Sequence, residues 1–76
     1  MEKDQFLVSL GSRLRSIRKQ KRITQQQLAE LCSIEKANLS RIESGITNPT
    51  ILTLFKMSKA LETTLPDFFT GHQEGL

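Results

Sequence analysis

Residues 24–45 read TQQQLAELCSIEKANLSRIESG, and this stretch predicts two short helices joined by a tight turn. The first helix should begin after Thr24, because Thr is a favoured N-cap and Gln27, three positions later, completes a capping box. Four residues form its expected inward side: Leu28, Ala29, Leu31 and Cys32. The second helix should cover residues 35–44, since Gly45 suits the left-handed conformation at which many helices end.

The second helix has two unlike faces. At about 100° per residue, Leu39 and Ile42 fall on one side. The opposite side carries two cations, a hydroxyl and a methyl group: Lys36, Ala37, Ser40 and Arg41. Such side chains suit base edges, since Arg or Lys can bind guanine, Ser several bases and Ala the thymine methyl. A solvated face of an ordinary helix has the same pattern, but the preceding short helix favours DNA recognition.

An ordered set of residues continues this pattern along the chain: Thr24-Gln25-x-x-Leu28-Ala29, then Ile34, Leu39-Ser40-x-Ile42-Glu43-x-Gly45 and Asn48-Pro49-Thr50. The set resembles the Cro/C1-type (XRE) helix-turn-helix family, which includes phage repressors and the small controller proteins of restriction–modification systems. The resemblance covers residues 7–69. It implies an all-α, compact five-helix domain like that of lambda repressor, whose second and third helices form the DNA-binding unit.

The resemblance also assigns roles to individual residues. It implies base contacts from the helix of residues 35–44 in the major groove, through Lys36, Ala37, Ser40 and Arg41. Arg41 is the expected guanine contact, whereas Lys36 suits either a guanine or a phosphate. Gln25 lies in the first turn of its helix, where free backbone amides favour a phosphate. Four further residues are expected to contact the DNA backbone: Asn38, Ser44, Thr47 and Asn48.

Two further sites concern protein contacts. The resemblance implies a structural salt bridge between Arg18 in the first helix and Glu43 near the end of the third. Leu65, Phe68 and Phe69, with part of the fourth helix, are the expected homodimer interface, because aromatic anchors are favoured in such patches. Both Phe residues could instead close the monomer core. We expect one of them in each role, and the sequence does not say which.

The remaining helices follow from apolar spacing. Leu7, Leu10, Leu14 and Ile17 predict an amphipathic helix over residues 4–21. Gly11 is a weak point of that helix, and a close approach by another helix is a role for it that the sequence itself does not show. A helix over residues 51–61 should follow the N-cap Thr50, with an inward side of Leu54, Met57, Ala60 and Leu61 and with Ile51 and Phe55 as further candidates for burial. A short fifth helix should follow the N-cap Thr64, with Asp67 near its positive end. We expect a domain of residues 1–70 and a disordered tail of residues 71–76.

Three residues depart from the family pattern. Ser33 occupies the turn position where Gly is common, and non-Gly residues are unfavourable in left-handed geometry. Glu35 stands where Ser, Thr or Asp often caps the third helix. Glu62 replaces the Gly that often ends the fourth helix. These departures put the local geometry of three helix ends in question rather than the fold.

The composition limits the class of protein. The chain has 76 residues and a net charge of +3, and six cations but no acid lie between Gln5 and Ala29: Arg13, Arg15, Arg18, Lys19, Lys21 and Arg22. Clustered positive charge favours a polyanionic partner. No long apolar run or secretory signal is present, so we expect a cytoplasmic protein without membrane contact. The resemblance implies a bacterial or phage origin. Cys32 and His72 form no metal-ligand set, so we expect neither a metal nor a cofactor.

We therefore predict a sequence-specific DNA-binding transcriptional regulator that acts as a homodimer on a palindromic operator. The alternative is an antitoxin-type protein-interaction module that masks a toxin and binds its own promoter secondarily. An enzyme is disfavoured, because the chain has no Gly-rich phosphate loop and no nucleophile elbow. Cys32 should be a small buried hydrophobe rather than a redox switch. RNA polymerase is a candidate partner for which the sequence carries no diagnostic surface.

Overall fold

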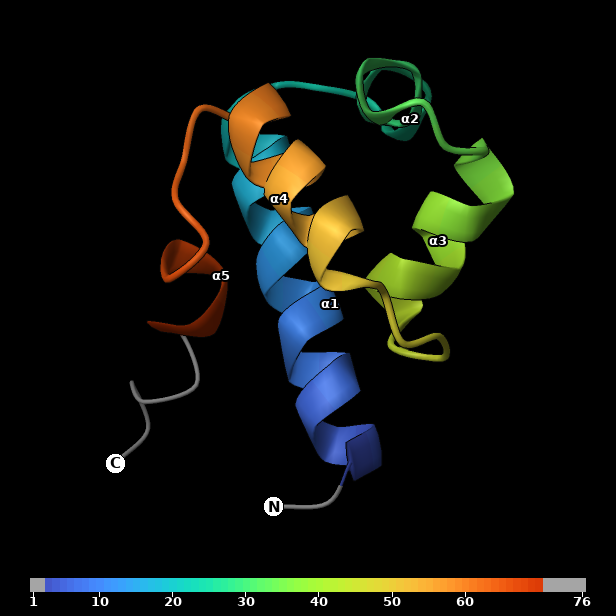
Figure 1. Cartoon of the computed structure of the whole chain (residues 1–76), viewed down its shortest axis with the longest axis vertical. Helices are drawn as coiled ribbons and strands as arrows, with labels where there is room; N and C mark the ends of the chain where they lie inside the picture. The colour runs from blue at the N-terminus through green and yellow to red at the C-terminus, as the bar shows by residue number, and fades with distance from the viewer. Residues whose placement is uncertain (1–2, 71–76) are drawn as a thin grey trace.

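The computed structural model describes residues 3–70, which form five α-helices and no strand (Figure 1). The helices are α1 (Lys3–Gln20), α2 (Gln25–Cys32), α3 (Lys36–Ser44), α4 (Ile51–Ala60) and α5 (Asp67–Thr70). The long helix α1 lies at the centre, with α3 and α5 on opposite sides of it. The all-α five-helix expectation is confirmed. The predicted tail, residues 71–76, lies outside the described residues.

The core forms where the apolar faces of these helices meet. The predicted stripe of α1 is buried, as are Leu28, Ala29 and Cys32 of α2. The prediction for Leu31 is wrong, because its side chain is 63% exposed. At 100° per residue, Leu31 lies about 60° outside the arc spanned by the other three residues of that face. Ile51 and Phe55, the further candidates for burial in α4, are exposed as well.

The structure separates the two aromatic residues of α5. Phe68 is fully buried in the core, so its assignment to a dimer interface is wrong. The short α5 has few side chains to contribute, and Phe68 closes the core between it and α1. Leu65 and Phe69 are half-buried, and the Phe69 ring stacks on Phe6 of α1 with ring centroids 6.1 Å apart.

The helix ends follow from local chemistry. Thr24 and Gln27 form the predicted capping box, in which the Gln27 N–H donates to Thr24 Oγ1 and the Thr24 N–H donates to Gln27 Oε1. Ser33 and Glu62 are left-handed, with φ of 57° and 55°, at the two positions where the sequence departs from glycine. Arg22 (φ 61°) is a third such residue, which the sequence analysis did not identify.

The start of α5 is capped differently from the prediction. The Asp67 carboxylate accepts hydrogen bonds from the backbone N–H of Thr64 and from the hydroxyls of Thr63 and Thr64. The hydroxyl of Thr64 is therefore a donor rather than the capping acceptor. These hydrogen bonds, the one from the Thr63 hydroxyl first among them, hold the pKa of Asp67 below its usual range.

Within residues 3–70, no helix combines the length and apolarity that a bilayer crossing requires.

Candidate nucleic-acid interface

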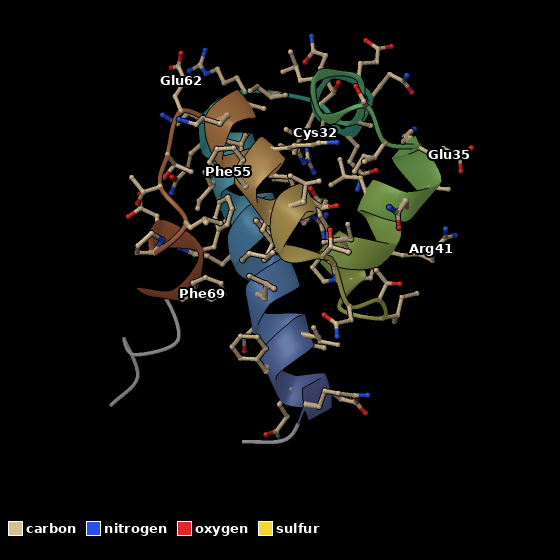
Figure 2. All side chains as sticks on the ribbon, viewed as in Figure 1. Cys32, Glu35, Arg41, Phe55, Glu62 and Phe69 are labelled. Carbon is tan, nitrogen blue, oxygen red and sulfur yellow. The ribbon has the colours of Figure 1, made fainter. Side chains whose placement is uncertain are left out.

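Helix α3 has one side in the core and the other in solvent. Leu39 and Ile42 are buried against the rest of the domain, which holds the helix on the outside of the molecule. The predicted base-reading residues lie on the free side, where Lys36, Ala37 and Arg41 are exposed and Ser40 is half-buried. Figure 2 shows the Arg41 side chain pointing away from the body of the domain. The outward side of α3 is therefore open to a large partner.

The two carboxylates of α3 and its N-cap, Glu35 and Glu43, differ in exposure and in pairing. Glu35 is the N-cap of α3, is exposed and makes no side-chain capping hydrogen bond, as the sequence predicts for a Glu. Its charge lies next to the positive end of the helix dipole. Glu43 is buried and paired with Arg18. The charge presented by the outward side of α3 is therefore dominated by Lys36 and Arg41.

Glu43 joins three helices. Arg18 of α1 donates to it twice, from Nε to Oε2 at 2.7 Å and from Nη2 to Oε1 at 3.1 Å. Arg18 Nη1 also donates to the carbonyl of Ile23, just before α2, at 2.8 Å. Gln25, the first residue of α2, donates from Nε2 to Glu43 Oε1 at 2.9 Å. The Arg18–Glu43 pair is the one that the resemblance implies, whereas no pattern in the sequence predicts the third partner, Gln25.

The remaining predicted backbone contacts surround α3. Asn38 is half-buried on its flank, and Ser44 is exposed at its last turn. Thr47 and Asn48 follow in the loop to α4, the first half-buried and the second exposed. Gly45 ends the helix with φ of 79°, and a Cβ there would lie 2.5 Å from Val8 Cα. The start of this loop is thereby held against α1.

The cations of α1 have different surroundings. Arg13 is half-buried and donates from Nε to the carbonyl of Asp67 at 3.0 Å, so it ties α1 to α5. Arg18 belongs to the buried pair. Arg15 and Lys19 are exposed on one side of α1, and Lys21 and Arg22 are exposed in the turn that follows it. These four residues carry exposed positive charge along α1 and the turn that leads to α2.

Two other kinds of site find no support among residues 3–70. The structure contains no group of His, Cys, Asp and Glu residues there that could hold a metal ion. Cys32 is buried, and burial raises the pKa of its thiol, with Lys56 opposing this more weakly. A protonated, buried thiol is a poor nucleophile and a poor redox sensor. Cys32 thus acts as a small core residue.

Comparisons with known proteins agree with this geometry. A model of the family HTH_3, described as helix-turn-helix, matches residues 14–68. The immunity repressor protein of Bacillus phage phi105 is 37% identical over 54 residues, which are 71% of this chain and 38% of that protein. The chain thus spans well under half the length of this curated relative.

Two solved structures extend the comparison to the fold. The restriction–modification controller protein C.AhdI from Aeromonas hydrophila has a TM-score of 0.81 and 30% identity, covering 83% of this chain and 96% of that one. SinR, a master regulator for biofilm formation whose crystal structure is in complex with DNA, has a TM-score of 0.74 and 34% identity, covering 79% of this chain and 97% of that one. Each match covers almost the whole of the solved chain to which this one is similar.

Proposed function

Because the chain belongs to the Cro/C1-type (XRE) helix-turn-helix family, a non-enzymatic family of DNA-binding transcriptional regulators, we propose that it binds specific DNA sequences through α3. One observation carries this proposal. Helix α3 keeps Leu39 and Ile42 in the core and leaves Lys36 and Arg41 on an open, cationic surface. The match to SinR, which was solved in complex with DNA, supports DNA as the partner.

Base recognition is proposed for the exposed side of α3. Arg41 binds a guanine, to which its fork of donors is matched in the major groove. Lys36 binds a guanine or a phosphate, Ser40 binds a base edge, and Ala37 contacts a thymine methyl. These contacts specify the sequence, whereas contacts to phosphates position the domain on the duplex.

Phosphate contacts are proposed on the flanks of α3. Gln25 and the free amides at the start of α2 bind one phosphate. Asn38, Ser44, Thr47 and Asn48 bind the DNA backbone from α3 and the loop that follows it. Because each of these side chains is neutral, they add affinity without adding to its salt dependence, which comes from cations that displace counterions.

We also propose that two copies bind a palindromic operator. Two-fold symmetry places the recognition helices about 34 Å apart, so each must lie about 17 Å from the axis. The molecule is 22 Å across in the direction that runs horizontally in Figure 1, and α3 and α5 lie on opposite sides in that direction. An interface on the side of α5 thus fits the required spacing and leaves α3 free.

The proposed interface combines Leu65 and Phe69, both half-buried, with the exposed apolar residues of α4: Ile51, Leu52 and Phe55. Leu52→Glu should abolish the dimer, because a carboxylate would be buried without a partner. Leu31→Glu is the matched control, since Leu31 is equally exposed on α2 and lies outside this surface. Sedimentation velocity at micromolar concentration measures both variants. A wild-type chain that stays monomeric even on DNA contradicts the proposal.

Selection of bound sequences from a random DNA pool tests the function as a whole. We expect a palindromic motif with half-sites one helical turn apart. A set of enriched sequences without two-fold symmetry would contradict the dimer, and the absence of any enriched sequence would contradict specific DNA binding. Where a motif is enriched, the same selection with the Arg41→Ala variant should lose one specified position in each half-site.

A second candidate function, the masking of a protein partner such as a toxin, is favoured by one observation. Leu31 is exposed at the edge of an open hollow that it shares with Arg22, Ile23, Gln27 and Glu30. An apolar residue with a charged rim is typical of protein-binding surfaces. A toxin gene beside the gene for this chain, and loss of co-purification of its product with the Leu31→Glu variant, would support this function over direct regulation.

A further inference from the structure

The side chain of Gln25 is held before any DNA arrives. Its Nε2 donates to Glu43 Oε1 at 2.9 Å, across 18 residues of sequence. The acceptor is itself fixed, because the Glu43 side chain is only 3% exposed and Arg18 donates to both of its oxygens. Hydrogen bonds to an ionised acceptor are about twice as strong as those between neutral groups. The Gln25 amide is therefore held in one orientation.

This arrangement leaves a donor for DNA. A Gln amide carries two N–H donors, and Glu43 accepts from one of them. The second is available at the start of α2, where the backbone N–H groups of Gln25 and Gln26 have no partner within the helix. Because Arg18 compensates the charge of Glu43, the carboxylate can sit beside a phosphate site without a net negative charge.

We propose that Glu43 is a positioning residue for the phosphate contact of Gln25, a role that rests on the proposed DNA-binding function. The carboxylate orders the amide in the free protein, so that the entropy of immobilising it is not lost on binding. Ordering one flexible side chain typically reduces affinity by about two- to tenfold. Through the same hydrogen bond, Glu43 also fixes the start of α2, the phosphate-binding end, relative to α3, the base-reading helix.

The test is a double-mutant cycle in DNA affinity, with an operator taken from the random-pool selection. Glu43→Gln should weaken binding about two- to tenfold in the wild-type background. It should have no further effect in the Gln25→Ala background, because the amide on which Glu43 acts is then missing. The slope of affinity against salt should not become shallower, since no cation–phosphate contact is lost. Circular dichroism confirms that each variant is folded under the binding conditions.

The chain contains a matched control pair. Gln26 donates from Nε2 to Glu30 Oε2, also at 2.9 Å, but both residues are exposed and lie within α2. Gln26→Ala and Glu30→Gln should show no coupling in DNA affinity. If this exposed pair couples as strongly as Gln25 and Glu43, the buried position of Glu43 is irrelevant and the proposal fails.

A second variant covers the case in which Glu43→Gln does not fold, because that substitution leaves Arg18 without a full counter-charge. Arg18→Met combined with Glu43→Leu removes both charges and the acceptor together, an exchange that buried ion pairs often tolerate. It should lower DNA affinity in the wild-type background and not in the Gln25→Ala background.

The outcomes separate the two proposals. Equal losses in both backgrounds would show that Glu43 acts on the fold and not through Gln25. Tighter binding by Glu43→Gln would show that the carboxylate repels phosphate, which also overturns the positioning role. In both cases wild-type DNA binding stands. If wild-type protein enriches no sequence at all, the proposed function fails and the positioning role fails with it.

Discussion

Gly11 of α1 lies directly against the backbone of Glu43 in α3, where a Cβ atom would meet the Glu43 carbonyl oxygen at 2.5 Å and its carbonyl carbon at 2.8 Å. This is the close helix approach that the sequence itself does not show. The same approach brings Arg18 within reach of the Glu43 carboxylate. A residue without a side chain is thus a condition for the ion pair that Arg18 makes about two turns further along α1.

Gly11→Ala should destabilise the domain, although alanine favours a helix by up to about 1 kcal/mol. The added methyl has no room against a carbonyl, and overpacking of this kind costs about 1–3 kcal/mol. The free energy of unfolding, measured with urea at one protein concentration, should therefore fall by about 1–2 kcal/mol. Ser12→Ala, at the next and exposed position, is the control and should be neutral or slightly stabilising.

Arg41 can be tested for base recognition separately from charge. Arg41→Ala should cost about 1–3 kcal/mol in binding and relax the preference at one base pair. Arg41→Lys keeps the charge but loses the planar fork of donors. It should relax the same base preference while keeping the slope of affinity against salt, measured by fluorescence anisotropy. If both variants select the wild-type motif, Arg41 does not contact a base.

Ser33 is a site where a substitution should stabilise the protein. Its φ of 57° lies in the left-handed region, which costs a non-glycine residue about 1–2 kcal/mol. Ser33→Gly should raise the free energy of unfolding by about 1 kcal/mol after the larger backbone entropy of an unfolded glycine is deducted. Ser16→Gly, in the exposed middle of α1, should instead lose about 0.5–1 kcal/mol. If the backbone geometry is the cause, chemical denaturation should show a higher free energy of unfolding for Ser33→Gly and a lower one for Ser16→Gly.

Asp67 should make stability depend on acid pH. Hydrogen bonds from the Thr63 hydroxyl, the Thr64 N–H and the Thr64 hydroxyl lower its pKa in the folded state. Its contribution is therefore complete above the pKa of the unfolded chain and is lost as the pH falls through the lower, folded pKa. The thermal midpoint of Asp67→Asn should lie below that of the wild type at neutral pH, and the gap should close in acid. A gap that stays constant with pH would contradict this role.

Local patterns were sufficient for most helix boundaries and for one cap. Thr24 and Gln27 form the capping box that their spacing predicts, and Gly45 ends α3 in the left-handed conformation. The apolar steps of α1 were equally informative, since Leu7, Leu10, Leu14 and Ile17 are all buried. Each of these features depends on residues only a few positions apart, so it can be predicted from the sequence alone.

Burial that depends on contacts between residues far apart in the sequence could not be predicted from local patterns. Phe68 and Phe69 are adjacent and chemically identical, yet only the first is fully buried, because α5 is placed against α1 by the whole domain. Leu31 was expected in the core and is exposed, since α2 buries a narrower arc than its apolar residues suggest. Neither outcome follows from periodicity, which gives the faces of a helix but not the extent of its neighbours.

The sequence by itself determined the helix order, the family and the residue types on the exposed side of α3. Capping, amphipathic spacing and motif order are all short-range properties. Only the tertiary structure decided that Gln25 reaches Glu43 and that Phe68 closes the core. The physical reason is the same for both: a hydrogen bond or a buried ring depends on which helix packs against which. For the hydrogen bond, that packing includes the close contact of α1 with α3 at Gly11.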